Sequence, residues 1–146
     1  MKKQLLIFGL ATALLTGACS ANRDCDLFAC NRKACPTART PAYFAFDSSV
    51  LSTEDRDNLD MIAQRLMANP DERITINGYA DNQGPQAYNK ELSLERAESA
   101  AKYLEWKGIN PNRIKTHGYG ASNFATGNAT PADRAKNRRI EVLFTK

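Results

Sequence analysis

The chain has 146 residues, of which 42% are hydrophobic and 25% charged, and this length and composition are typical of a single globular domain. Its 20 basic and 16 acidic side chains give a net charge of +4. A charge this small, without a basic tract interleaved with aromatic residues, argues against a protein that binds nucleic acid.

The first 18 residues have the three parts of a secretory signal peptide. Lys2 and Lys3 form a positive start, residues 5–15 form an apolar stretch, and small residues lead into Cys19. The apolar stretch is too short to span a bilayer comfortably, and no second apolar run follows it in the sequence. We therefore expect residues 1–18 to be removed on export.

Residues 15–19, Leu-Thr-Gly-Ala-Cys, resemble a bacterial lipobox, with Thr16 in a place where a large aliphatic residue is usual. The resemblance implies that Cys19 becomes the lipidated first residue of the mature protein, and that Ser20 allows sorting to the outer membrane. Acyl chains anchor a protein by burying methylene groups, at about 0.8 kcal/mol each. The alternative is ordinary cleavage after a nearby alanine, which would release a soluble periplasmic protein.

Residues 19–41 have neither helical nor strand periodicity, and they contain all four cysteines of the chain. If Cys19 carries lipid, Cys25, Cys30 and Cys35 remain, and the oxidising periplasm permits a disulfide among them. One intramolecular bridge would leave an odd thiol that could bond to another protein. A zinc site is the alternative, but such sites normally have more closely spaced cysteine pairs. We interpret this segment as a tether between the anchor and a folded domain.

Residues 42–146 form the predicted domain, in which strand patterns alternate with helical patterns. The predicted strands are residues 42–46, 73–77, 113–117 and 138–144. The predicted helices run from the N-cap Ser52 to Asn69, from about Tyr88 or Ser93 to Lys107, and over a short stretch after the N-cap Thr130. This β-α-β-α-β-(α)-β order predicts an α+β two-layer sandwich, with helices on one face of a mixed four-stranded sheet.

An acid and an arginine mark the loop and the helix that follow the second predicted strand. Asp81 lies in a glycine-bounded loop just past the end of that strand, and Arg96 lies 15 residues later, near the predicted start of the next helix. Loops at strand ends often form binding sites, and helix N-termini favour anions. Asp81 could take the ammonium of a small zwitterionic ligand, and Arg96 could take its carboxylate in a bidentate contact. The alternative is structural: Asp81 caps a turn, and Arg96 forms a surface ion pair.

Residues 42–144 resemble the OmpA-like peptidoglycan-binding domain. The matching segments occur in family order and at family spacing over nearly the whole mature domain. They are Tyr43-Phe44-Ala45-Phe46-Asp47, Gly78-Tyr79-Ala80-Asp81-Asn82-Gln83-Gly84, Asn89, Leu92-Ser93-Leu94-Glu95-Arg96-Ala97, Gly118-Tyr119-Gly120 and Asn137-Arg138-Arg139-Ile140-Glu141. The resemblance implies that the ligand is meso-diaminopimelate of the peptidoglycan peptide stem, whose free end carries an ammonium and a carboxylate.

The resemblance also implies a role for each of five residues. The family's binding acid matches Asp81, and its binding arginine matches Arg96. Asn89 matches a supporting polar position, and Asp47 and Arg138 match positions that shape the pocket.

These features together predict a non-catalytic lipoprotein that anchors the outer membrane to the cell wall. The alternative is an adaptor lipoprotein of an envelope machine, such as the Tol system or a secretion or motility complex, that uses the same wall-binding domain. We expect no enzyme activity, because no base is indicated beside the serines after Asp47 and no acid other than Asp81 lies in a comparable loop. We expect no cofactor, no metal in the domain and no nucleic-acid partner.

Overall fold

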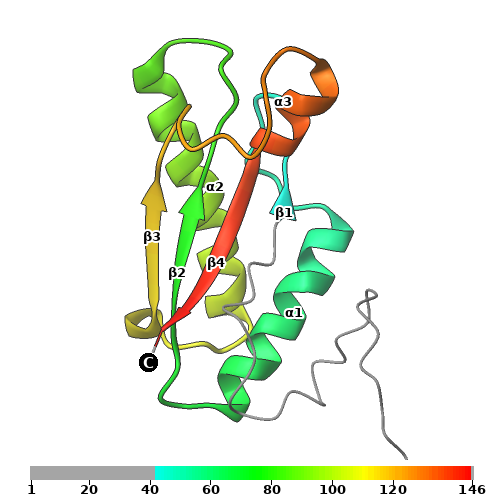
Figure 1. Cartoon of the computed structure of the whole chain (residues 1–146). Helices are drawn as coiled ribbons and strands as arrows, with labels where there is room; N and C mark the ends of the chain where they lie inside the picture. The colour runs from blue at the N-terminus through cyan, green and yellow to red at the C-terminus, as the bar shows by residue number, and fades with distance from the viewer. Residues whose placement is uncertain (1–41, 146) are drawn as a thin grey trace, which may run out of the picture. The chain divides into compact units, whose positions relative to one another are not determined.

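The structure, a computed structural model, describes residues 42–145 (Figure 1). The elements in chain order are β1 (Ala42–Tyr43), α1 (Thr53–Ala68), β2 (Arg73–Gly78), α2 (Gln86–Trp106), the 3-10 helix η1 (Pro111–Arg113), β3 (Ile114–Gly118), α3 (Pro131–Asn137) and β4 (Arg139–Thr145). The predicted signal peptide, the lipidation at Cys19, and the tether with its disulfides at Cys25, Cys30 and Cys35 lie outside the described residues. Between residues 42 and 145, no helix has the length and apolar character needed to cross a membrane.

The four strands form one mixed sheet in the order β1-β4-β2-β3. β2 is parallel to β3, whereas β4 is antiparallel to both of its neighbours, β2 and β1. The last residues of β2 and β3 and the first residues of β4 therefore meet at one end of the sheet. This end is uppermost in Figure 1, and we refer to it as the upper end. This mixed sheet with its three helices confirms the predicted α+β class.

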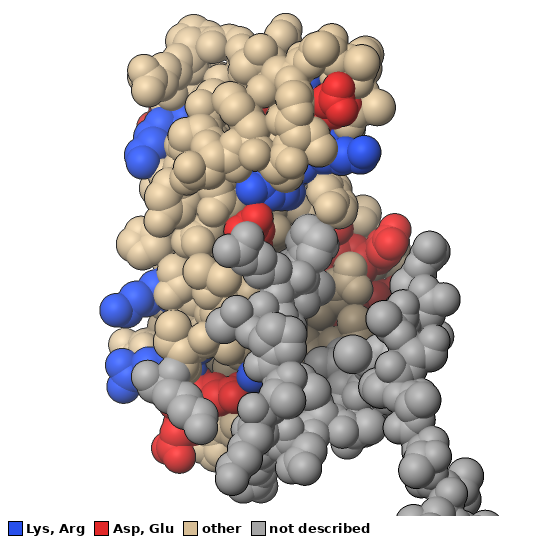
Figure 2. Space-filling model, in the orientation of Figure 1, with Lys and Arg blue, Asp and Glu red and all other residues tan. Residues whose placement is uncertain are grey.

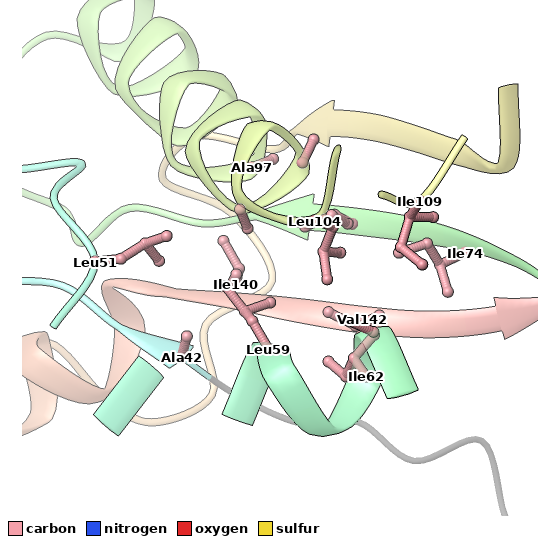
Figure 3. Close-up of a cluster of buried hydrophobic side chains, with 14 of the residues drawn as sticks. Ala42, Leu51, Leu59, Ile62, Ile74, Ala97, Leu104, Ile109, Ile140 and Val142 are labelled. Atoms are coloured by element: carbon pink, nitrogen blue, oxygen red, sulfur yellow. The ribbon is translucent and has the colours of Figure 1, made fainter. Parts of the chain in front are cut away.

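The hydrophobic core lies between one face of the sheet and helices α1 and α2 (Figure 3). Its central side chains are Leu59 and Ile62 of α1, Ile74 and Ile76 of β2, Ala97 and Leu104 of α2, and Ile140 and Val142 of β4. The aliphatic side chains buried in β2 and β4 lie at alternate positions, as the sequence alternation predicts, whereas Asn77, Gly78 and Arg139 at the upper end are buried as well. Each large aliphatic side chain buried here contributes about 1.5–3 kcal/mol, so the core holds both helices firmly against the sheet.

Two glycines allow α2 to approach the upper ends of β2 and β3. A Cβ atom on Gly78 would lie 1.8 Å from the backbone oxygen of Ser93, and one on Gly118 would lie 2.6 Å from the backbone nitrogen of Leu94. No larger residue fits at either position unless the helix moves. The Ser93 hydroxyl completes the contact by accepting a hydrogen bond of 2.8 Å from the Gly120 N–H. This packing brings the middle of α2 to the upper end of the sheet.

The helix ends follow local capping signals. Ser52 is the N-cap of α1, and Asp55 completes its capping box. Thr130 is the N-cap of α3, with Pro131 in the first turn. Gly108 follows the end of α2 with a φ of 94°, which suits glycine. These predicted ends are confirmed, because a cap depends mainly on residues that are adjacent in sequence.

Two predicted boundaries are wrong by more than one residue. β1 has only two residues instead of the five predicted over 42–46, because the carbonyl oxygens of Phe44 and Ala45 accept hydrogen bonds from arginine side chains. α2 begins at Gln86 rather than at Tyr88 or later, and its N-cap makes no side-chain hydrogen bond that a capping pattern could reveal. Arg96 consequently lies in the middle of α2 rather than near its start.

On the face shown in Figure 2, the basic and acidic side chains are interspersed and do not gather in a patch of one sign. Some of the charged side chains of the domain form ion pairs, such as Arg65 with Glu72 at 2.9 Å and Lys107 with Asp60 at 2.7 Å. Partly exposed pairs of this kind contribute about 0–1 kcal/mol each, so they do not determine the fold.

Candidate binding site

A cavity of about 250 Å³ opens at the upper end of the sheet, between the loop after β1, the loop after β2 and one face of α2. The residues that line it are Phe46, Asp47, Ala80, Asp81, Gln83, Gly84, Pro85, Tyr88, Asn89, Leu92, Arg96 and Arg138. All five candidate residues are among them, although they come from four separate parts of the sequence. The fold therefore brings the predicted set together at one place.

Asp81 is fixed at the cavity wall by two hydrogen bonds. Its Oδ1 atom accepts from the Gln83 N–H at 3.0 Å, and its Oδ2 atom accepts from Nη1 of Arg138 at 3.0 Å. The side chain is nearly buried, since Asp81 has a relative exposure of only 3%. Asp81 thus does cap a turn, as the structural alternative holds, and it also presents a carboxylate to the cavity.

Arg96 lies fully buried, with a relative exposure of 0%, and contributes to the lining of the cavity. Its Nε donates to the Ser48 carbonyl at 2.8 Å, its Nη1 to the Tyr79 carbonyl at 3.0 Å, and its Nη2 to the Ala45 carbonyl at 3.3 Å. A guanidinium has five N–H groups, so two remain for a ligand. The surface ion pair considered as an alternative is wrong, because Arg96 is not at the surface.

The charge on Arg96 depends on its neighbours. Burial, helped by the nearby Arg138, lowers the pKa of Arg96 from its usual value to about 10, whereas Asp81 and Asp47 act in the opposite direction. Because this pKa lies well above 7, Arg96 stays protonated at neutral pH. Two acids and two arginines therefore surround the cavity, and their formal charges cancel.

This balance determines which ligands the cavity suits. A buried charge is costly unless an opposite charge pairs with it. A simple anion would give the cavity a net negative charge, and a simple cation would give it a net positive charge. A ligand that carries one positive and one negative group preserves the balance, so the electrostatics favour a zwitterion.

Asp47 lies at the exposed rim of the cavity, where its φ of 52° places it in the left-handed region that Asp tolerates better than most residues. Its Oδ1 atom accepts a hydrogen bond from the hydroxyl of Tyr88. This hydrogen bond raises the pKa of Tyr88 above its usual value, so the hydroxyl stays protonated and can donate. Asp47 and Tyr88 together join the loop after β1 to the first turns of α2.

Asn89 and Arg138 hold the cavity walls. Nδ2 of Asn89 donates to the Gln83 carbonyl at 2.9 Å and makes a longer contact of 3.4 Å with the Asp81 carbonyl. Arg138 lies just before β4, rather than within it as predicted, and its Nε donates to the Phe44 carbonyl at 3.0 Å. Both side chains therefore position the loops that carry the acids.

Tyr88 and Leu92 line the cavity but were not among the candidate residues. Tyr88, Leu92 and Arg96 follow one another at intervals of four residues, and this spacing places all three on one face of a helix. A helix that starts at Tyr88, one of the two predicted starts, already contains this spacing. The sequence therefore carried the signal for both residues, but the prediction did not use it.

Residues 42–145 contain no group of three or more His, Cys, Asp and Glu side chains arranged to hold a metal ion. The cavity offers carboxylates and guanidinium groups, and the positive groups disfavour a cation. The arrangement can bind and orient a small charged molecule through hydrogen bonds.

The fold and the cavity define an α+β domain with a charge-balanced pocket at the end of a mixed sheet. The OmpA family model matches residues 43–138, well over half of the chain, and the chain therefore belongs to the OmpA family. The prediction made from the sequence motifs is confirmed at the level of family and fold.

Curated relatives match the domain rather than their own full lengths. The peptidoglycan-binding protein ArfA of Mycobacterium tuberculosis is 44% identical over 103 residues, which cover 70% of this chain and 32% of that protein. Outer membrane protein A of Bordetella avium is 46% identical over 100 residues, which cover 68% of this chain and 52% of that protein. The chain thus spans only about a third to a half of these relatives.

A solved structure has the same fold. The peptidoglycan-associated lipoprotein from Burkholderia pseudomallei superposes with a TM-score of 0.70 at 28% sequence identity. The match covers 72% of this chain and 89% of that one. Most of that structure is therefore equivalent to the domain described above.

Proposed function

We propose that this protein binds peptidoglycan without catalysis, and that the cavity grips the free end of meso-diaminopimelate in the peptide stem. The observation that carries the proposal is that Asp81 and Arg96 line one cavity whose charges balance. Membership in the OmpA family supports it, and so does the likeness to ArfA, which is named as a peptidoglycan-binding protein.

The chemistry of the two ends follows from the available donors and acceptors. The ligand's ammonium binds the Asp81 carboxylate, which also accepts a hydrogen bond from Arg138. The ligand's carboxylate takes the two N–H groups that Arg96 does not use within the protein. Each charge-assisted hydrogen bond contributes about 1.5–3 kcal/mol, so the set accounts for selective binding of modest affinity.

The N-terminal sequence adds an anchor to this grip. A lipid on Cys19 would hold the protein in the outer membrane, and the tether of residues 19–41 would let the domain reach the wall. Fully extended, a tether of this length spans at most about 75 Å. The protein would thereby link the two layers of the envelope noncovalently, because individual wall contacts could exchange while the anchor stays in place.

Co-sedimentation of the purified domain with insoluble peptidoglycan tests the proposal. The variants Asp81→Asn and Arg96→Ala are expected to remain in the supernatant, because each removes one side of the ligand's charge pairing. Asp57→Asn and Arg56→Ala are the matched controls, since both residues lie exposed on α1 away from the cavity. Circular dichroism identifies any variant that fails to fold. The proposal fails if folded Asp81→Asn and Arg96→Ala sediment as wild type does.

A further inference from the structure

A second hollow, of about 540 Å³, lies on the other side of the first turn of α2. Its lining residues are Gln86, Ala87, Lys90, Tyr119, Gly120, Ala121 and Ser122. The two hollows are neighbours, because Pro85 and Asn89 line the first and the adjacent residues Gln86 and Lys90 line the second. A ligand held in the first cavity can therefore continue around the helix end into the second hollow.

Tyr119 provides a fixed aromatic surface in this hollow. Its ring stacks on Tyr79 with a centroid distance of 5.4 Å and an interplanar angle of 14°, and it remains 40% exposed. Tyr79 is buried, and the guanidinium of Arg139 lies 4.1 Å from its ring centroid. Ser122 donates from its hydroxyl to the Tyr119 carbonyl at 2.7 Å and so holds the backbone there. A ring that is already held in place loses little entropy when a ligand packs on it.

The polar groups around this ring differ from those of the first cavity. The exposed amide of Gln86 and the hydroxyl of Ser122 border the hollow, and the ammonium of Lys90 lies over the Tyr119 ring, 5.9 Å from its centroid. No carboxylate lines it, so it does not repeat the charge pairing that suits a zwitterion. An exposed aromatic face bordered by neutral and basic hydrogen-bonding groups suits a sugar. A pyranose ring packs its C–H face on an aromatic ring, while its hydroxyl and N-acetyl groups form hydrogen bonds.

We propose that this second hollow binds an N-acetylated sugar of the glycan strand, packed on Tyr119, while the attached peptide stem lies in the first cavity. The inference rests on the proposed function, because both subsites would hold parts of one polymer. It extends that function from the amino-acid end of the stem to the sugar that bears it.

The dimensions of the polymer fit this placement. Two amino acids and a lactyl group separate diaminopimelate from the sugar, and an extended chain of three such units spans about 10 Å. An α-helix with its side chains is about 10–12 Å wide. The stem can therefore pass over the first turn of α2 between the two subsites.

Calorimetric titration with two probes tests the inference. One probe is the free tripeptide L-Ala-D-Glu-meso-diaminopimelate, and the other is the same tripeptide on N-acetylmuramic acid. The wild-type domain is expected to bind the muramyl tripeptide about threefold to tenfold more tightly, as one aromatic packing contact allows. Tyr119→Leu, which still covers Tyr79 but lacks a flat ring, is expected to lose this preference while its affinity for the free tripeptide stays within about twofold.

Two controls separate the sugar contact from general effects. Tyr119→Phe keeps the ring and is expected to keep the preference. Trp106→Ala removes a highly exposed aromatic side chain, with 76% relative exposure, at the opposite end of α2, and is expected to change neither affinity. Equal affinities of the wild type for the two probes, or an undiminished preference in Tyr119→Leu, would overturn this inference alone. If the wild type binds neither probe, the proposed function fails and this inference fails with it.

Discussion

Arg96 combines a structural role with the proposed binding role. Its guanidinium joins the loop after β1 to the end of β2 through three backbone carbonyls, and it keeps two further N–H groups for a ligand. The walls of the cavity and one of its binding groups therefore depend on the same side chain. This dual use explains why such a costly buried charge is present in the domain.

Replacing Arg96 with lysine is expected to destabilise the domain. The Lys ammonium cannot reproduce the planar donor geometry, so at least two of the three backbone carbonyls lose their partner. Arg96→Lys should lower the free energy of unfolding by roughly 2–4 kcal/mol in urea denaturation. Arg56→Lys, at an exposed site on α1, should change it by less than about 0.5 kcal/mol. Equal stabilities of Arg96→Lys and wild type would contradict the structural role assigned to this arginine.

Single residues were predictable from the sequence to different degrees. Asp81 and Arg96 stood out because their types and spacing matched the chemistry of a charged ligand and the motifs of a family. Arg138 was identified only through the family resemblance, and its bond to Asp81, which joins residues 57 positions apart in the chain, was not predicted. No local pattern encodes a contact of that kind, since it depends on the strand order of the finished sheet.

The position of α2 against the sheet sets the geometry of the cavity and of the neighbouring hollow. Gly78 and Gly118 let the helix lie directly against the upper ends of β2 and β3. Helix ends and strands with local signals were predicted correctly, such as the capping box at Ser52. The length of β1 was predicted wrongly, because the carbonyl oxygens of residues 44 and 45 accept hydrogen bonds from the side chains of Arg138 and Arg96.

Gly78→Ala is expected to push α2 away from β2. The new Cβ would lie 1.8 Å from the Ser93 carbonyl oxygen. The backbone of a packed helix cannot shift away from it without a large cost in free energy. We expect the free energy of unfolding to fall by about 3 kcal/mol in chemical denaturation, near the upper end of the usual overpacking cost. Gly127→Ala is the matched control, because nothing lies within 4 Å of a Cβ at that position. An unchanged midpoint for Gly78→Ala would mean that the close helix packing is not required.

At the scale of the whole molecule, the fold collects distant segments at one end of the sheet. β4 runs antiparallel to β2, so the start of β4 lies beside the end of β2. Arg138, just before β4, therefore lies near Asp81, just after β2. The sequence predicted the fold class, because alternating strand and helix patterns leave few compact arrangements. It could not predict the cavity itself, which exists only where the loops after β1 and β2, together with Arg138, meet one face of α2.

The proposed anchor concerns the whole chain, and its test concerns Cys19. Replacing this residue in Cys19→Ser removes the thiol that would carry lipid. We expect the variant to move from the membrane fraction to the soluble fraction of lysed cells, because it would no longer have acyl chains to bury in the bilayer. Ser20→Ala is the control and should stay with the membrane. If Cys19→Ser remains in the membrane fraction, attachment does not depend on a lipidated Cys19.

The central claim is that Asp81 and Arg96 recognise the two opposite charges at the end of diaminopimelate. The most direct measurement is a calorimetric titration of the domain with L-Ala-D-Glu-meso-diaminopimelate and with the same tripeptide ending in lysine, which keeps the side-chain ammonium but lacks its neighbouring carboxylate. We predict that the lysine peptide binds roughly 10-fold to 100-fold more weakly, which corresponds to one lost charge-assisted contact. Equal affinity for the two peptides would contradict the claim.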